Sequence, residues 1–162
     1  MTALALKLDL SIPPEWSRID PTREAVGLLV MAMFGDDDLR DALAMVSEEL
    51  LENAIKYCAP DTTVSITIRN EGPKVAIAVT NVVDGGSAHL GVLAERIAWL
   101  TQFPSPAEAY TAAIGRVYEG GERPPGEPGL GIVRIAYEGR CSVAYDLTVP
   151  GKVTVRAVCP RT

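Results

Sequence analysis

The chain has 162 residues, of which 48% are hydrophobic and 22% charged, which suits one globular domain over 1–162 and leaves two domains thin. Its formal net charge is −6 and no cluster of lysine and arginine stands out, so the composition argues against nucleic acid as a partner. The chain also lacks a run of about 18 apolar residues and a basic leader before an apolar stretch. We therefore expect a soluble cytoplasmic protein without a membrane-spanning segment.

Three cysteines and one histidine limit the metal and covalent chemistry. Cys58, Cys141 and Cys159 are odd in number and far apart, without a CxxC pair. This spacing predicts reduced thiols rather than a disulfide framework or a zinc site. His89 is the only histidine and no nucleophile-elbow motif accompanies it, so we interpret it as an ordinary surface or loop residue and expect no Ser/His/Asp triad.

The first half of the chain predicts a strand and two helices. Leucine and isoleucine alternate with small or polar residues over 3–12, which indicates a half-buried strand that Pro13 ends. A helix is expected from Asp20, as the N-cap, to Gly35; its apolar content indicates burial on more than one side or contact with a second protein. A second helix is expected over 36–57, with a core stripe at three- and four-residue spacing: Leu39, Leu43, Val46, Leu50 and Ala54.

The second half combines hairpins and helices. Alternating apolar residues predict two antiparallel hairpins, at 63–82 and 141–158. Between them the pattern predicts three helices, at 87–102, 107–118 and 130–137. A loop rich in glycine and proline, 120–128, precedes the last helix. The element order β-α-α-β-β-α-α-α-β-β predicts an α+β fold: a two-layer sandwich whose mixed, mostly antiparallel sheet of about five strands is covered by helices on one face.

The polar edge of the second helix carries the first candidate site. At 100° per residue, Asn53 and Lys56 lie within roughly 40° of Glu49 around the helix axis. A carboxylate, an amide oxygen and an ammonium on one edge suit a magnesium-chelated phosphate, because the amide ligates Mg²⁺, the carboxylate activates a nucleophile and the lysine meets phosphate charge. The alternative is a solvated helix face with weak i,i+4 pairing.

Two glycine-containing segments follow. Asn81, Asp84 and Gly86 come at the exit of a predicted strand, where a backbone can approach a ligand closely, although the same residues also suit a simple turn. The run Gly129-Leu130-Gly131 opens the 130–137 helix. Exposed amides and the helix dipole there favour an anion, although glycine-rich helix entries also serve packing alone.

Taken in this order, the motifs resemble the GHKL ATPase family with the Bergerat fold, which includes histidine-kinase catalytic domains, anti-sigma-factor serine kinases, gyrase and Hsp90. The chain is most similar to the small anti-sigma-factor kinase branch, because the acid at Glu49 fits that branch better than the asparagine usual in histidine kinases. The resemblance implies that Glu49 is the catalytic general base, that Asn53 binds Mg²⁺ and that Lys56 lies near the phosphates.

The match to the family's second motif is incomplete. The family places an aspartate after an alternating strand, where it accepts a hydrogen bond from the adenine amino group. Asn81 takes that position here and Asp84 comes three residues later; a bulge at the strand exit would exchange their roles, so both remain candidates for the base contact. The amide oxygen of Asn81 can still accept from an amino group, at a loss on the order of 1–3 kcal/mol relative to a carboxylate.

The third motif departs as well. Its Gly-Leu-Gly core is present, but Glu127 replaces the preceding glycine and Pro128 removes a backbone amide, which weakens the expected affinity for Mg-ATP. Arg123 and Arg134 are candidates to offset the added negative charge.

The resemblance thus implies a regulatory protein that binds ATP or ADP, and a Mg-ATP-dependent serine/threonine kinase of a bacterial partner-switching pathway. Its protein partner would be a sigma factor or an anti-anti-sigma, STAS-like protein. The alternative is a pseudoenzyme of the same fold that has lost nucleotide affinity and docks such a protein, or a second copy of itself as a homodimer, through the apolar run Leu28-Leu29-Val30-Met31. A histidine-kinase-like domain acting in trans is a third, weaker alternative.

Overall fold

The computed structural model describes residues 7–83, 88–120 and 130–161. Within these ranges five strands form one sheet in the order β1-β2-β3-β5-β4, and every pairing between neighbours is antiparallel. The strands are β1 (Lys7–Ile12), β2 (Val64–Asn70), β3 (Lys74–Val82), β4 (Ser142–Asp146) and β5 (Lys152–Pro160). Both predicted hairpins are confirmed, whereas the expected mixture of strand directions is not found in the described sheet. The predicted start of the first strand, 3–6, lies outside the described residues.

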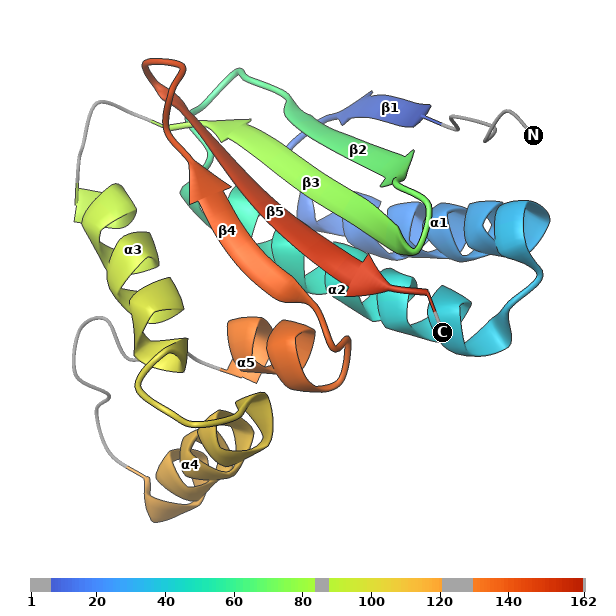
Figure 1. Cartoon of the computed structure of the whole chain (residues 1–162). Coiled ribbons are helices and arrows are strands. Elements are labelled where there is room, and N and C mark those ends of the chain that lie inside the picture. Colours follow the sequence, from blue (N-terminus) through green and yellow to red (C-terminus); the bar gives the residue numbers. More distant parts are fainter. Residues whose placement is uncertain (1–6, 84–87, 121–129, 162) are drawn as a thin grey trace.

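The helices cover one face of the sheet and one of its ends (Figure 1). They are α1 (Ile19–Phe34), α2 (Asp37–Tyr57), α3 (Ala88–Leu100), α4 (Pro106–Glu119) and α5 (Leu130–Tyr137), with a short 3-10 turn before α1. Helices α1 and α2 lie behind the sheet, while α3, α4 and α5 gather on the side of β4. The predicted α+β two-layer sandwich is confirmed. No helix in the described ranges is long and apolar enough to cross a membrane.

Helix α2 is the element on which the core is built. Asp36 caps its N-terminus, with a carboxylate oxygen 3.0 Å from the amide nitrogen of Leu39. All members of the predicted apolar stripe are buried: Leu39, Leu43, Val46, Leu50 and Ala54. Because this stripe packs into the core, the polar edge that carries Glu49 and Asn53 is left facing α3 and α5.

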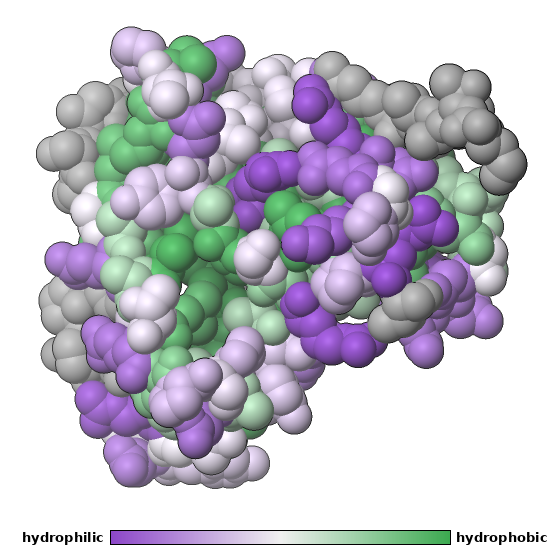
Figure 2. Space-filling view, in the orientation of Figure 1, coloured by the Kyte–Doolittle hydropathy of each residue, from purple (hydrophilic) through white to green (hydrophobic). Residues whose placement is uncertain are grey.

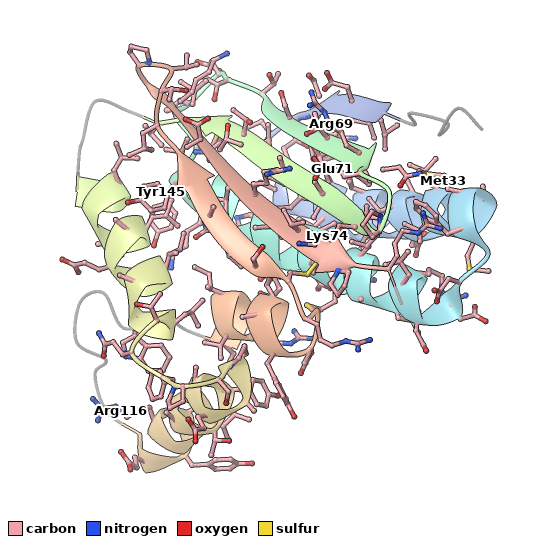
Figure 3. All side chains as sticks on the ribbon, in the orientation of Figure 1. Met33, Arg69, Glu71, Lys74, Arg116 and Tyr145 are labelled. Atoms are coloured by element: carbon pink, nitrogen blue, oxygen red, sulfur yellow. A yellow bond between two sulfur atoms is a disulfide. The ribbon has the colours of Figure 1, made fainter. Side chains whose placement is uncertain are left out.

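The two faces of the sheet differ as an alternating pattern predicts. The face toward α1 and α2 is apolar and buried, and includes Ile66, Ile68, Ile77, Val79, Val153 and Val155. The opposite face, turned to the viewer, is hydrophilic on the side of β1, β2 and β3 and more hydrophobic toward β4 and α3 (Figure 2). It carries Arg69 and the paired hydroxyls of Thr80 and Thr154, with oxygens 2.7 Å apart. Figure 3 shows Arg69, Glu71 and Lys74 at the turn between β2 and β3. Asn81 lies near the end of β3, on the same buried face that packs against the helices.

Helix α1 differs from the prediction at its start. Asp20 does not cap the helix: the 3-10 turn runs directly into it, and Arg18 holds the capping position without a side-chain hydrogen bond. Gly35 ends the helix as predicted, in the left-handed conformation with φ 62°. The apolar content of α1 is divided between a face buried against α2, with Val26 and Val30 fully buried, and Leu28, which is 74% exposed.

The last hairpin corrects two predictions. Strand β4 ends at Asp146 rather than at 149, because the carboxylate of Asp146 accepts a hydrogen bond from the amide of Thr148 at 2.8 Å and starts the turn. The prediction of three reduced cysteines is wrong: Cys141 and Cys159 form a disulfide, and Cys58 is the free cysteine among the described residues. Ser142 of β4 pairs with Val158 of β5. The residues next to this pair are Cys141 and Cys159, which are 18 apart in sequence and therefore face each other across the two strands.

Candidate functional site

A pocket of about 430 Å³ lies where the polar edge of α2 faces α3 and α5. Three predicted residues line it from α2, Glu49, Asn53 and Lys56, and a fourth, Gly131, lines it from the first turn of α5. Sequence reasoning had joined these residues only through a family resemblance, because 75 positions or more separate Gly131 from the α2 edge. The structure brings them into one cavity.

The adjacent acids Glu48 and Glu49 point to different helices. A carboxylate oxygen of Glu48 lies 3.1 Å from a guanidinium nitrogen of Arg23 on α1, so this side chain joins α1 to α2. The carboxylate of Glu49 lies 2.7 Å from a guanidinium nitrogen of Arg134 on α5. Of the two, Glu49 lines the pocket, which agrees with the residue chosen from the sequence.

The absence of a side chain at Gly131 leaves room for the Glu49 carboxylate between α5 and α2. A Cβ atom built at this position would lie 2.6 Å from Oε2 of Glu49, which is closer than real Cβ contacts allow. Any side chain at 131 would therefore displace the Glu49 carboxylate. Glycine at this position makes room for the Glu49 carboxylate, in addition to any contact that its backbone makes with an anion.

The charged form of Glu49 is disfavoured by its surroundings. Burial raises the pKa of its carboxyl group, and the charges of Glu52 and Glu48 add to the increase, whereas Arg134 opposes it by charge and hydrogen bonding. The side chain is 13% exposed, so water screens these effects only partly. A carboxylate with a raised pKa is a better proton acceptor, as a general base requires.

The raised pKa predicts a pH-dependent stability. The folded chain binds the Glu49 proton more tightly than the unfolded chain, so this group's contribution to stability is largest at low pH and is lost as pH rises through its folded pKa. Glutamine cannot ionise. We expect the free energy of unfolding of Glu49→Gln minus that of the wild type to increase between about pH 4 and 7. Urea unfolding at both pH values measures it, with exposed Glu24→Gln as the control; a difference that falls with pH contradicts the assignment.

The structure adds four pocket residues that were not among the predicted site residues: Trp16, Glu52, Arg96 and Ile132. Arg96 comes from α3, and its Nε atom is buried without a hydrogen-bond partner in the part of the chain that is described. Leu93, three positions earlier, is fully buried. The sequence therefore did contain a signal for Arg96, because an arginine three residues from a buried leucine lies beside the apolar stripe of α3. With Lys56, Arg96 gives the pocket two positive side chains beside Asn53.

Asn81 lies elsewhere in the core. It is 3% exposed, at the helix-facing end of β3, and is not among the residues that line the pocket. Its Nδ2 atom has no hydrogen-bond partner within the described ranges. A buried amide with an unfilled donor suits a ligand that offers an acceptor, such as a ring nitrogen of adenine.

Some predicted site residues cannot be placed beside these. Asp84, Gly86, Arg123, Glu127, Pro128 and Gly129 lie outside the described residues, as does most of the predicted 120–128 loop. Leu130 is described: it begins α5 and packs on a small cluster formed by Ala109, Ala113 and Val133. Arg134, a candidate to offset charge near phosphates, instead pairs with Glu49 and with Glu138.

Comparison with known proteins gives one informative result. No family model matches the sequence, and no curated protein matches it. Among solved structures, a chain in the crystal structure of the SiaB–SiaC complex from Pseudomonas aeruginosa has a similar fold, with a TM-score of 0.72 and 19% sequence identity. The match covers 95% of this chain and 89% of that one. The likeness establishes the fold. Function has to be argued from the site itself.

Proposed function

We propose that this protein is a nucleotide-binding regulator that holds Mg-ATP between α2 and α5 and phosphorylates a serine or threonine of a small protein partner. The observation that carries the proposal is the single pocket that gathers Glu49, Asn53, Lys56, Arg96 and Gly131. A purely structural role for this edge gives no reason to collect two acids, an amide and two cations around a cavity.

The residues present fit the expected ligand. The amide oxygen of Asn53 suits Mg²⁺, and Lys56 and Arg96 suit phosphate oxygens. Bound Mg²⁺ would neutralise phosphate charge during transfer. The unfilled donor of Asn81 suits the base. Glu49, with its raised pKa, would accept the proton of the attacking hydroxyl.

The proposed partner is a protein. The structural neighbour was solved as a complex of two named proteins, SiaB and SiaC, which shows that a chain of this fold is found in such an assembly. A sigma factor or an anti-anti-sigma, STAS-like protein is the class of partner that the family resemblance implies. The acceptor hydroxyl would belong to that partner.

Asn53→Ala tests the nucleotide site. We expect ATP to bind the wild type with Mg²⁺, and the variant to bind roughly tenfold to hundredfold more weakly, because a direct Mg²⁺ ligand is removed. Calorimetric titration of ATP with and without Mg²⁺ measures both. Asn70→Ala, an asparagine in the β2–β3 turn, is the matched control. Equal Mg²⁺-dependent binding by wild type and Asn53→Ala would rule out the proposed site.

One observation favours a second candidate, a pseudoenzyme that works by docking. The Glu49 carboxylate is already engaged by Arg134, an arrangement that also suits a purely structural ion pair between α2 and α5. No binding heat and no thermal shift at millimolar ATP would support this candidate, and the search would then turn to its protein partner.

A further inference from the structure

The Glu49 carboxylate is held on both sides by α5. One oxygen, Oε1, accepts a hydrogen bond from Nη1 of Arg134 at 2.7 Å. The other, Oε2, lies against the backbone of Gly131, where a Cβ would come within 2.6 Å. The hydrogen bond from Arg134 therefore ties the carboxylate to α5, and the absence of a side chain at Gly131 leaves room for it.

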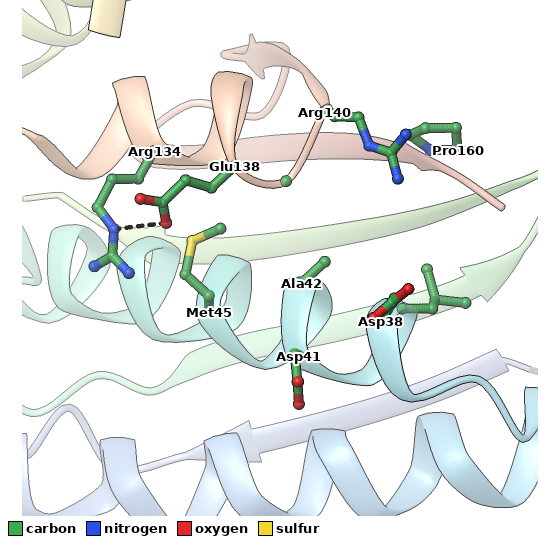
Figure 4. A pocket seen from close by; sticks show the side chains of 10 residues that line it. Asp38, Asp41, Ala42, Met45, Arg134, Glu138, Arg140 and Pro160 are labelled. Atoms are coloured by element: carbon green, nitrogen blue, oxygen red, sulfur yellow. Dashed lines mark hydrogen bonds and ion pairs between the residues drawn. The ribbon is translucent and has the colours of Figure 1, made fainter. Parts of the chain in front are cut away.

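Arg134 is held in turn by a second acid. Its Nε atom donates to Oε2 of Glu138 at 3.1 Å, the contact drawn as a dashed line in Figure 4. The other carboxylate oxygen of Glu138 accepts a hydrogen bond from the hydroxyl of Tyr110 on α4, also at 3.1 Å. Tyr110 packs on Tyr137, with ring centroids 4.7 Å apart. A continuous series of polar contacts thus runs from α4 through α5 to the acid on α2.

Arg134 lines a cavity other than the candidate nucleotide pocket. Figure 4 shows it at one end of a pocket of about 340 Å³, between α2 and the end of α5, whose lining includes Met45, Glu138 and Arg140. Its partner Glu49 lines the other pocket, where the site residues meet. Arg134 is therefore not one of the side chains that line the candidate nucleotide pocket, and it reaches that pocket through Glu49.

We propose that Arg134 is the positioning residue of Glu49: it holds the carboxylate oriented toward the pocket, and Glu138 and Tyr110 tie its position to α4. This inference rests on the proposed function, in which Glu49 is the general base. Without Arg134, two acids of α2, Glu49 and Glu52, would face the pocket with only Lys56 and Arg96 to balance them.

Arg134→Met and Arg134→Lys test the proposal on the full chain. Carboxyl carbon NMR of glutamate-labelled protein, with the Glu49 signal assigned from Glu49→Gln, follows the titration of this one acid. Arg134 lowers the pKa of Glu49, so Arg134→Met should move the titration to higher pH and Arg134→Lys should move it less. Arg140→Met, an exposed arginine at the far end of the second pocket, is the control and should leave the Glu49 signal in place.

The outcomes separate this inference from the proposed function. The Glu49 titration requires no nucleotide, so it tests the role of Arg134 even if the calorimetric experiment with Asn53→Ala shows that ATP is not bound. An unchanged Glu49 titration in a folded Arg134→Met protein would overturn the role of Arg134; if that variant does not fold, an unchanged titration in Arg134→Gln, which also removes the charge, would do so. Where phosphoryl transfer is observed, Arg134→Met should lower kcat by roughly a hundredfold with little change in the KM for ATP, and lysine should restore part of the loss.

Discussion

Glu49→Gln is expected to lower phosphoryl transfer to a protein acceptor by roughly 10²- to 10⁴-fold while Mg-ATP binding persists. Glutamine keeps the size of the side chain and one hydrogen-bond acceptor for Arg134, but it cannot take a proton. The largely buried Glu49 carboxylate both lines the pocket and lies beside Gly131 in the first turn of α5, so no neighbouring acid can replace it. Transfer of labelled phosphate to the partner, with ATP binding measured in parallel, separates the two effects.

Glu48→Gln is the matched control for that experiment. It removes a carboxylate one residue away whose contact is with Arg23 on α1, and it should leave transfer within a fewfold of wild type. If the two variants lose activity equally, the loss comes from the net charge of α2 and Glu49 is not the base. If Glu49→Gln loses ATP binding as well, the carboxylate contributes to the nucleotide site rather than to proton transfer.

The fold was largely predictable because its elements carry strong local signals. The apolar stripe of α2, its acid-rich start at Asp36 and the turn at Gly35 each have a local physical cause, and each is found as predicted. The error about the cysteines arose where two segments meet. The Cys141–Cys159 bond depends on the register of β4 against β5, which no count of cysteines contains.

The residues of the candidate site also divide into those with a local signal in the sequence and those that depend on packing between elements. Glu49, Asn53 and Lys56 were predicted together because helical spacing places them on one edge. Arg96 and the contact between Arg134 and Glu49 were not, because they depend on how α3 and α5 pack against α2. Gly131 was singled out from the motif, but the atom that it makes room for, Oε2 of Glu49, belongs to another helix.

Asn81→Leu is expected to change stability and affinity in opposite directions. In the free protein the side chain is 3% exposed and its Nδ2 atom lacks a hydrogen-bond partner among the described residues, so an apolar side chain of similar size should raise the free energy of unfolding by roughly 1–3 kcal/mol. If the same atom contacts the base, its loss should weaken Mg-ATP binding by roughly tenfold to hundredfold. Thermal unfolding without Mg-ATP measures the change in stability. The rise in melting temperature on adding Mg-ATP measures the change in affinity, because ligand binding stabilises the folded protein.

Ser47→Ala provides the comparison. Ser47 is fully buried, but its hydroxyl already donates to the carbonyl of Ala44 at 2.7 Å, so its removal should bring no comparable gain in stability and no change in the shift caused by Mg-ATP. A higher melting temperature for Asn81→Leu with a smaller nucleotide-induced shift identifies a polar group kept in the core for a ligand. A lower melting temperature would mean that the amide has a partner in the free protein, and an unchanged shift would assign the base contact elsewhere, with Asp84 as the next residue to replace.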